Sequence, residues 1–170
     1  MATTLPRRRS LSGRLLLFGI ISALVVAADQ WTKQLATELL FLSGTRSVAV
    51  IGEYIRFTYV ENRGAAFGLL QNQTAFFILV GIVVITVIAL SFRYMQNPGI
   101  PLVICLGLQM GGAIGNLIDR IRSGFVVDFI DLTFWPVFNL ADSAIVVGVI
   151  LLAYQVAIRP IESPSSADNA

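Results

Sequence analysis

The sequence contains no histidine and only one cysteine, Cys105. Histidine and cysteine are the usual protein ligands of zinc, and a Cys/His pair supplies the nucleophile and base of many hydrolases. The sequence therefore argues against a zinc centre and against a Cys/His nucleophile, and we expect no metal site. A single cysteine also cannot form an intrachain disulfide, so the fold does not depend on an oxidising compartment.

Charge is also scarce, because only 13% of the 170 residues are charged while 56% are hydrophobic. A soluble globular domain carries about 25% charged residues. The membrane is therefore the expected solvent of a single domain that comprises residues 1–170. The formal net charge of +2 is small, and the basic residues are scattered through apolar sequence. We therefore expect no nucleic-acid partner.

Four apolar stretches predict four transmembrane helices, at about residues 14–33, 75–92, 101–118 and 141–158. A membrane-spanning helix needs about 20 mostly apolar residues. The first stretch reaches this length only if its helix continues past Ala28 to Lys33. Because three arginines at 7–9 precede it, a cleaved signal peptide is an alternative interpretation of this stretch.

The basic residues near the ends of the spans predict the orientation. Six lie on each side, but Arg7, Arg8, Arg9 and Arg14 form a dense cluster directly before the first span. This cluster places the N-terminus, and after four spans the C-terminus, in the cytoplasm.

Two segments outside the spans have the composition of β-strands. Residues 46–60 are rich in Val, Ile, Tyr and Phe around a turn at Gly52-Glu53, and residues 125–134 are similar. The predicted fold class is thus an all-α membrane protein: four transmembrane helices with a small β-sheet or cradle at the outer face.

Most polar residues of interest fall at that outer face, where spans one and three end and spans two and four begin. Charged groups in or beside a bilayer are costly and often mark function. A single one can be an interfacial anchor, but a set from several chain segments predicts a site. The candidate residues are Asp29, Lys33, Asn62, Asn116, Asp119, Arg120, Asp128, Asn139 and Asp142.

Two of these candidates, Asp128 and Asp142, have apolar neighbours. If their carboxyl groups lie close together, they share a proton and supply an acid and a base, as in aspartic proteases. In the alternative, Asp142 only caps the fourth helix and Asp128 pairs with Arg120 or Arg122. The residues alone leave both interpretations open.

The third span carries Gly107, Gly111 and Gly115 at four-residue spacing, with Gly112 beside them. This spacing leaves one helix face nearly bare. It therefore predicts that neighbouring helices approach the third span closely.

Five motifs occur in order along the chain, and together they resemble the lipoprotein signal peptidases (signal peptidase II), a bacterial family of aspartic endopeptidases. The motifs are Asp29–Lys33, Glu61–Phe67, Gly111–Arg120, Val126–Phe129 and Phe138–Asp142. The resemblance covers nearly the whole chain, from about Leu15 to Ile158.

This resemblance implies an enzyme of the bacterial inner membrane that cuts diacylglyceryl-modified prolipoproteins just before the lipidated cysteine. It implies Asp128 and Asp142 as the catalytic dyad and no metal or organic cofactor. It assigns support or substrate contact to the other candidates, with membrane lipids around them: Asp29, Lys33, Asn62, Asn116, Asp119, Arg120 and Asn139.

Two other functions agree with parts of the pattern. A small proton- or ion-coupled transporter would use intramembrane aspartates, but such groups usually lie near the midplane between structural repeats. No repeat is visible in this sequence. A scaffold protein would explain the glycines and leave the paired aspartates without a role.

Overall fold

The computed structural model describes residues 9–64, 70 and 72–158. In this part of the chain, four helices are long and apolar enough to cross a membrane. They are α1 (Arg9–Ala36), α2 (Thr74–Tyr94), α3 (Ile100–Ser123) and α4 (Leu140–Ile158), and α1 continues into a π-helical segment, η1 (Thr37–Leu42). The first helix runs on through Asp29 and Lys33, as a full-length span requires. The predicted fold class is confirmed.

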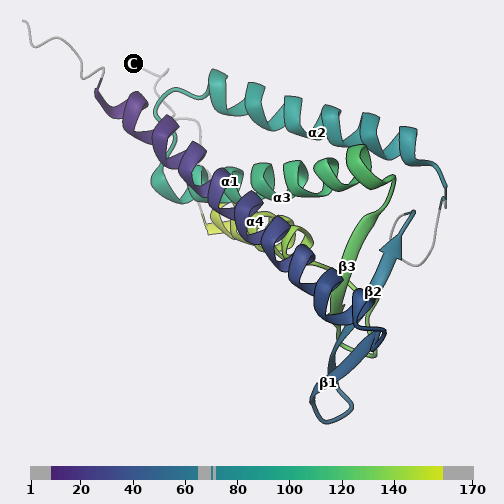
Figure 1. The fold of residues 1–170 in the computed structure, drawn as a ribbon. Helices are drawn as coiled ribbons and strands as arrows, with labels where there is room; N and C mark the ends of the chain where they lie inside the picture. The colour runs from purple at the N-terminus through teal and green to yellow at the C-terminus, as the bar shows by residue number, and fades with distance from the viewer. Residues whose placement is uncertain (1–8, 65–69, 71, 159–170) are drawn as a thin grey trace, which may run out of the picture.

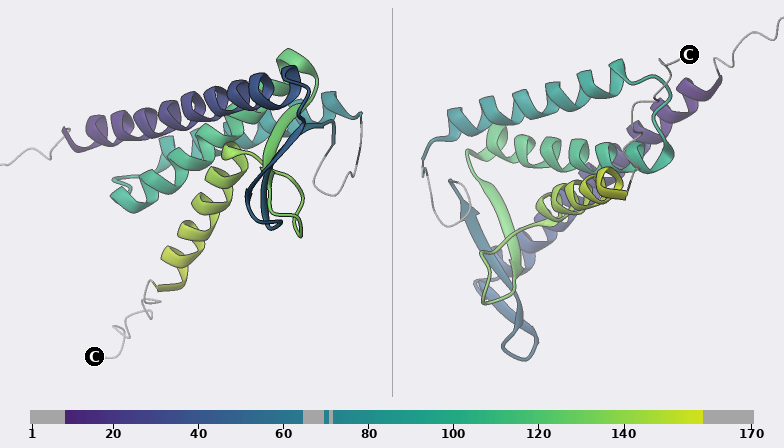
Figure 2. Two further views of the ribbon diagram at one scale, coloured as in Figure 1. Left: turned by 60° about the horizontal axis from the view of Figure 1, so that its bottom comes forward. Right: turned by 180° about the vertical axis from the view of Figure 1, so that it is seen from behind.

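Helix α3 forms the centre of the bundle, because α1, α2 and α4 all pack against it. It is also the most buried of the four helices. Figure 1 shows α3 between α2 and α1, and Figure 2 shows α4 running away from the other helices toward its C-terminal end.

Glycines on α3 allow these close contacts, as the four-residue spacing predicts. A Cβ atom added to Gly111 would lie 2.7 Å from the Ser22 carbonyl oxygen of α1. A Cβ atom added to Gly112 would overlap the Ala141 carbonyl oxygen of α4 and lie 2.7 Å from Cγ1 of Ile145. The bare face therefore serves two neighbours, with α1 on one side and α4 on the other.

The contact at Gly112 predicts a large response to one methyl group. We expect Gly112→Ala to lower the free energy of unfolding in micelles by about 1–3 kcal/mol, because a backbone carbonyl has to move. Gly19 is the matched control, since a Cβ atom there meets nothing within 4 Å. Gly19→Ala should leave stability unchanged or raise it by up to about 1 kcal/mol. Equal effects at the two positions would contradict the close contact.

A three-stranded antiparallel sheet, in the order β1-β2-β3, lies at one end of the bundle (Figure 1). Its strands are β1 (Ser47–Ile51), β2 (Ile55–Asn62) and β3 (Val126–Asp131). The predicted hairpin and the second β-like segment thus join in one sheet. Gly52 provides the turn of the hairpin with a φ of +54°, a conformation that glycine adopts without steric cost.

The sheet extends one predicted segment and confirms another. The β-like segment predicted at residues 46–60 continues to Asn62, which ends β2. Asp128 lies in β3, within the β-like segment predicted at residues 125–134, and pairs with Val60 across the ladder. On the sheet, Tyr59 and Phe129 are buried together with Ala36 and Leu40 at the end of α1 and in η1. This packing fixes the sheet to the helix bundle and so fixes the position of Asp128.

Candidate active site

Asp128 is one of two carboxylates at the centre of the site, and it is almost completely buried, with 1% of its surface exposed. Its two oxygens accept hydrogen bonds from amides: Oδ2 from Nδ2 of Asn62 at 2.9 Å and Oδ1 from Nδ2 of Asn139 at 2.6 Å. The ion pairs found in the described part of the chain do not include Asp128. The alternative in which Asp128 pairs with Arg120 or Arg122 is therefore wrong.

Asp142 is the third residue of α4 and lies in a reciprocal capping arrangement with Asn139. The backbone N–H of Asp142 donates to Oδ1 of Asn139 at 2.9 Å, and the backbone N–H of Asn139 donates to Oδ2 of Asp142 at 3.4 Å. Such a capping box satisfies backbone donors that would otherwise lack partners at the helix start. Asn139, rather than Asp142, is thus the residue that precedes and caps the helix.

Capping leaves the other oxygen of Asp142 for the site. Oδ1 accepts a hydrogen bond from Nδ2 of Asn116, on α3, at 2.7 Å. Asn139 also donates to Oδ1 of Asn116 at 3.2 Å. Asp128 and Asp142, which come from different chain segments, are therefore joined through the same two amide side chains.

The two carboxylates also influence each other electrically. Burial, and after it the negative charge of Asp142, raise the pKa of Asp128 to about 7. The hydrogen bonds from Asn62 and Asn139 oppose this rise. Near neutral pH, the pair therefore holds a proton on Asp128 that an exposed aspartate would have lost.

The raised pKa of Asp128 predicts how stability depends on pH. In the unfolded chain this carboxyl loses its proton near 3.8, and in the folded protein near 7. The folded state thus holds more protons between these values, so Asp128 makes the free energy of unfolding fall as pH rises from about 4 to about 7. Within this window, the fall is at most about 1.4 kcal/mol for each pH unit. Asp128→Asn should remove this part of the slope, which pH-dependent unfolding in micelles would measure. An identical slope in wild type and variant would contradict the raised pKa.

Lys33 is the centre of a second, buried cluster directly behind the carboxylates. Its ammonium group lies 2.8 Å from Oδ2 of Asp29 and 2.8 Å from Oδ2 of Asp119. It also donates to Oδ1 of Asn116 at 2.9 Å. Because Lys33 occupies the amide oxygen of Asn116, the amide nitrogen is directed to Asp142.

Asp29 extends this cluster to the start of α4. Its Oδ1 accepts the backbone N–H of Ala141 at 3.0 Å. Gln30 also contributes, since its amide donates to Oδ1 of Asp119 at 2.8 Å. Gln30 lies within the first motif but was not among the candidate residues, and its place beside Asp29 and Lys33 was the available signal.

Arg120 lies at the margin of the site toward α2. Its guanidinium is 5.0 Å from the centre of the Phe77 ring, a cation–π contact, and it donates to the Asn116 carbonyl at 3.4 Å. Every predicted site residue is thus in or beside one contact network. Within the described chain, no group of three potential ligands is arranged to hold a metal ion.

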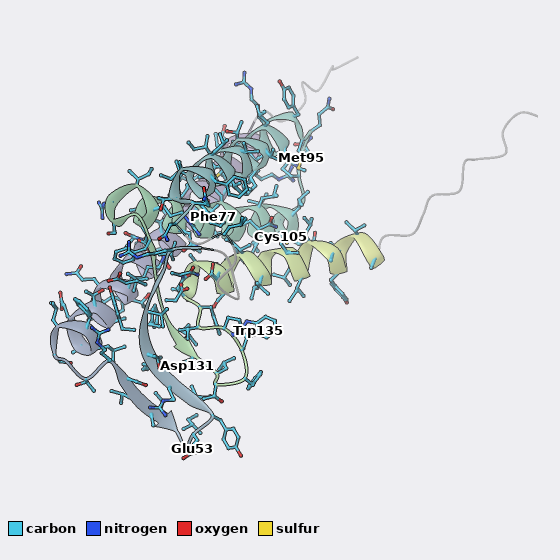
Figure 3. The ribbon with its side chains drawn as sticks, turned by 90° about the vertical axis from the view of Figure 1, so that its right-hand side faces the viewer. Glu53, Phe77, Met95, Cys105, Asp131 and Trp135 are labelled. Carbon is cyan, nitrogen blue, oxygen red and sulfur yellow. The ribbon has the colours of Figure 1, made fainter. Side chains whose placement is uncertain are left out.

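An apolar cavity of about 400 Å³ adjoins Asp142. It lies between the loop that follows β3 and the first turns of α4, and Figure 3 shows Trp135 on this loop. Its walls are Leu132, Phe134, Trp135, Phe138, Asp142, Ser143, Val146 and Val147. A second apolar cavity, of about 220 Å³, is lined by Phe129, Phe57 and the end of α1, and neither aspartate lines it.

The chain is similar to proteins of known family. The sequence profile of the family described as "Signal peptidase (SPase) II" matches residues 21–158. The chain is 49% identical over 139 residues to the lipoprotein signal peptidase of Moorella thermoacetica. This match covers 81% of this chain and 91% of that protein. It is 53% identical over 137 residues to that of Caldanaerobacter subterraneus, with 79% and 92% covered.

Solved structures are also similar. One, titled "Bacterial membrane enzyme structure by the in meso method at 2.3 A resolution", has a TM-score of 0.72 and 32% identity, and the match covers 81% of this chain and 85% of that one. A second, with the same title at 1.9 A, has a TM-score of 0.67 and 33% identity, with 81% and 90% covered. From the profile match and the identity to these relatives, the chain belongs to the signal peptidase II family of membrane peptidases.

Proposed function

We propose that Asp128 and Asp142 together perform the hydrolysis by which this protein removes signal peptides from diacylglyceryl-modified prolipoproteins, just before the lipidated cysteine. The observation that carries the proposal is the pair of carboxylates joined through Asn139. Its amide nitrogen donates to Asp128 at 2.6 Å, and its amide oxygen accepts the backbone N–H of Asp142 at 2.9 Å. Nothing in the comparisons supports the transporter.

The raised pKa of Asp128 supports a division of roles at neutral pH. Asp142, as carboxylate, takes a proton from water, whose oxygen attacks the carbonyl carbon of the scissile bond. Asp128 gives its proton to the carbonyl oxygen, which yields a tetrahedral diol. Asp142 then protonates the leaving nitrogen, the C–N bond breaks, and a hydroxyl of the diol returns a proton to Asp128.

The amides and the lysine cluster hold this geometry in the proposed enzyme. Asn62 and Asn139 orient Asp128, and Asn116 orients Asp142. Asp29, Lys33 and Asp119 support Asn116 and the start of α4 from behind. Arg120, beside Phe77 at the edge facing α2, is suited to contact the substrate backbone.

The apolar cavity beside Asp142 supports a lipidated substrate. The diacylglyceryl group is attached to the residue directly after the cut, so its acyl chains begin close to the aspartates. The cavity walls around Asp142 are almost entirely apolar. Burial of methylene groups there contributes about 0.8 kcal/mol each, which favours the lipidated form over the unmodified one.

The proposed setting is the bacterial inner membrane, with both termini in the cytoplasm, the site at the outer face and membrane lipids around one domain of residues 1–170. The arginines before the first span support this orientation. Nucleic acid has no part in the proposal. Reporter fusions after Ile158 and within residues 37–64 should report opposite sides of the membrane.

A cleavage assay with purified protein tests the proposed function. We expect a diacylglyceryl-modified prolipoprotein to be cut before its modified cysteine, as mass spectrometry of the product would show. The same prolipoprotein without the diacylglyceryl group should have a kcat/KM at least about tenfold lower, the equivalent of two buried methylene groups. Absence of cleavage of the modified substrate would contradict the proposal.

A further inference from the structure

Gln109, in the middle of α3, has an amide nitrogen that lacks a partner. In the described part of the chain, this nitrogen is the one buried side-chain N or O atom without a hydrogen bond. An unpartnered buried amide forfeits its hydrogen bond to water without replacement, and the hydrocarbon region of a bilayer offers no water to satisfy it. Such a donor is available to an acceptor that a bound molecule supplies.

Gln109 lies in the row of α3 residues that contacts α4 and leads to the site. Cys105 and Gln109 lie against Gly148, Gly112 lies against Ala141, and Asn116 donates to Asp142. Gly148 leaves the space for the Gln109 side chain, since a Cβ atom there would be 2.8 Å from its Cγ. The neighbours Leu106 and Met110 pack with Ile88 of α2. Gln109 therefore lies in the α4-facing row, directly beside Met110, which packs toward α2.

The position of Gln109 fits a peptide that approaches Asp128 and Asp142 from the membrane. Gln109 precedes Asn116 by two helical turns, which is about 10.5 Å along the axis. Residues next to a scissile bond have to be extended for the aspartates to reach the bond, and three extended residues span about 10 Å. The signal peptide runs from this bond toward the cytoplasm, the direction in which Gln109 lies.

An extended segment of signal peptide brings its own unsatisfied groups into this region. A helix bonds its carbonyls internally, whereas an extended stretch inside the membrane exposes them to hydrocarbon without partners. The amide nitrogen of Asn116 is already engaged by Asp142, while that of Gln109 is unused. Donor and acceptor are thus both without partners before the substrate binds.

We propose that Gln109 is a substrate-positioning residue whose amide donates a hydrogen bond to a backbone carbonyl of the signal peptide, about three residues before the cut. This inference rests on the proposed function. It concerns binding along the membrane-embedded part of the substrate and assigns Gln109 no part in bond breaking. Loss of a hydrogen bond that is equally strong in the bound substrate and in the transition state raises KM and leaves kcat unchanged.

The test compares Gln109→Met with Gln155→Met, which is the matched control. Gln155 is a second glutamine of the bundle, and its amide already has a partner, donating to Sγ of Cys105 at 3.0 Å. Methionine has a similar length and flexibility and no donor. For cleavage of the modified prolipoprotein, we expect Gln109→Met to raise KM about 3- to 10-fold with kcat unchanged, the range of one neutral hydrogen bond. Gln155→Met should leave both constants unchanged.

The thermal midpoint of the free protein gives a second readout. Gln109→Met should leave it unchanged or raise it, because no internal hydrogen bond is lost, and a lower midpoint would overturn the inference. A wild-type KM in Gln109→Met would overturn it as well. In a further substrate, an ester replaces the peptide bond that follows the third residue before the cut, and an ester carbonyl is a weaker acceptor than an amide carbonyl. With this substrate, the KM values of the wild type and Gln109→Met should differ less. Failure of the wild type to cleave would instead contradict the proposed function.

Discussion

Replacement of Asp128 or Asp142 by asparagine is expected to reduce cleavage of the modified prolipoprotein by about a thousandfold or more. Asparagine has the shape of aspartate, but it neither accepts a proton from water nor returns one to the leaving nitrogen. In the proposed dyad the two carboxylates act as one unit, so the loss of either one removes the whole mechanism. The rate of product formation under single-turnover conditions measures this effect.

The double variant gives the sharper result. If the aspartates acted independently, their effects would multiply, whereas a dyad predicts a double variant scarcely slower than either single one. Asp131→Asn is the control, because this aspartate also lies on β3 but accepts a hydrogen bond from Thr58 at 2.8 Å. It should cleave at a near wild-type rate. Near wild-type activity in either Asp128→Asn or Asp142→Asn would contradict the proposed dyad.

The second large effect is expected at Lys33. Lys33→Met removes the cation between two buried carboxylates, Asp29 with 0% and Asp119 with 8% of its surface exposed. A buried charge that loses its partner costs about 3–5 kcal/mol. We therefore expect the free energy of unfolding in micelles to fall by this amount, with loss of cleavage because Asn116 is no longer held.

Arg63 provides the comparison for a pair near the surface. Its guanidinium lies 2.8 Å from Glu61, as close as Lys33 lies to its partners, but 52% of its side chain is exposed. Arg63→Met should therefore lower the free energy of unfolding by less than about 1 kcal/mol. Addition of Asp29→Asn and Asp119→Asn to Lys33→Met should restore part of the lost stability. If the triple variant is no more stable than Lys33→Met, unpaired charge is not the cause of the lost stability.

The sequence predicted the architecture and the chain segments that meet at one membrane face, because both follow from the number of spans. Four spans place the ends of the first and third and the starts of the second and fourth at one face of the membrane. The count of the spans therefore places Asp29, Asn116 and Asp142 near this face. The glycine spacing on α3 likewise predicted close helix contacts. Neither inference needs side-chain directions.

The contacts between these residues depend on the directions of their side chains, which a sequence does not show. The rotation of α1 about its axis decides that Lys33 reaches both Asp119 and Asn116, and the sheet register decides that Asp128 meets Asn62. We therefore did not anticipate that Asn139 caps α4 or that amides, rather than arginines, hold Asp128. The unpartnered nitrogen of Gln109 is also invisible in sequence, because only the packed structure shows which donors have acceptors.

The hydrogen bond from the Ala141 backbone N–H to Asp29 joins residues that are 112 positions apart. During synthesis the chain emerges from its N-terminus, so α1 enters the membrane while α4 does not yet exist. Ala141, the hydrogen-bond partner of Asp29, is therefore synthesised late, together with Asn139 and Asp142. Assembly of the proposed dyad thus depends on completion of the chain: a product that ends before α4 lacks Asp142 and also lacks the hydrogen bond between the first and last helices.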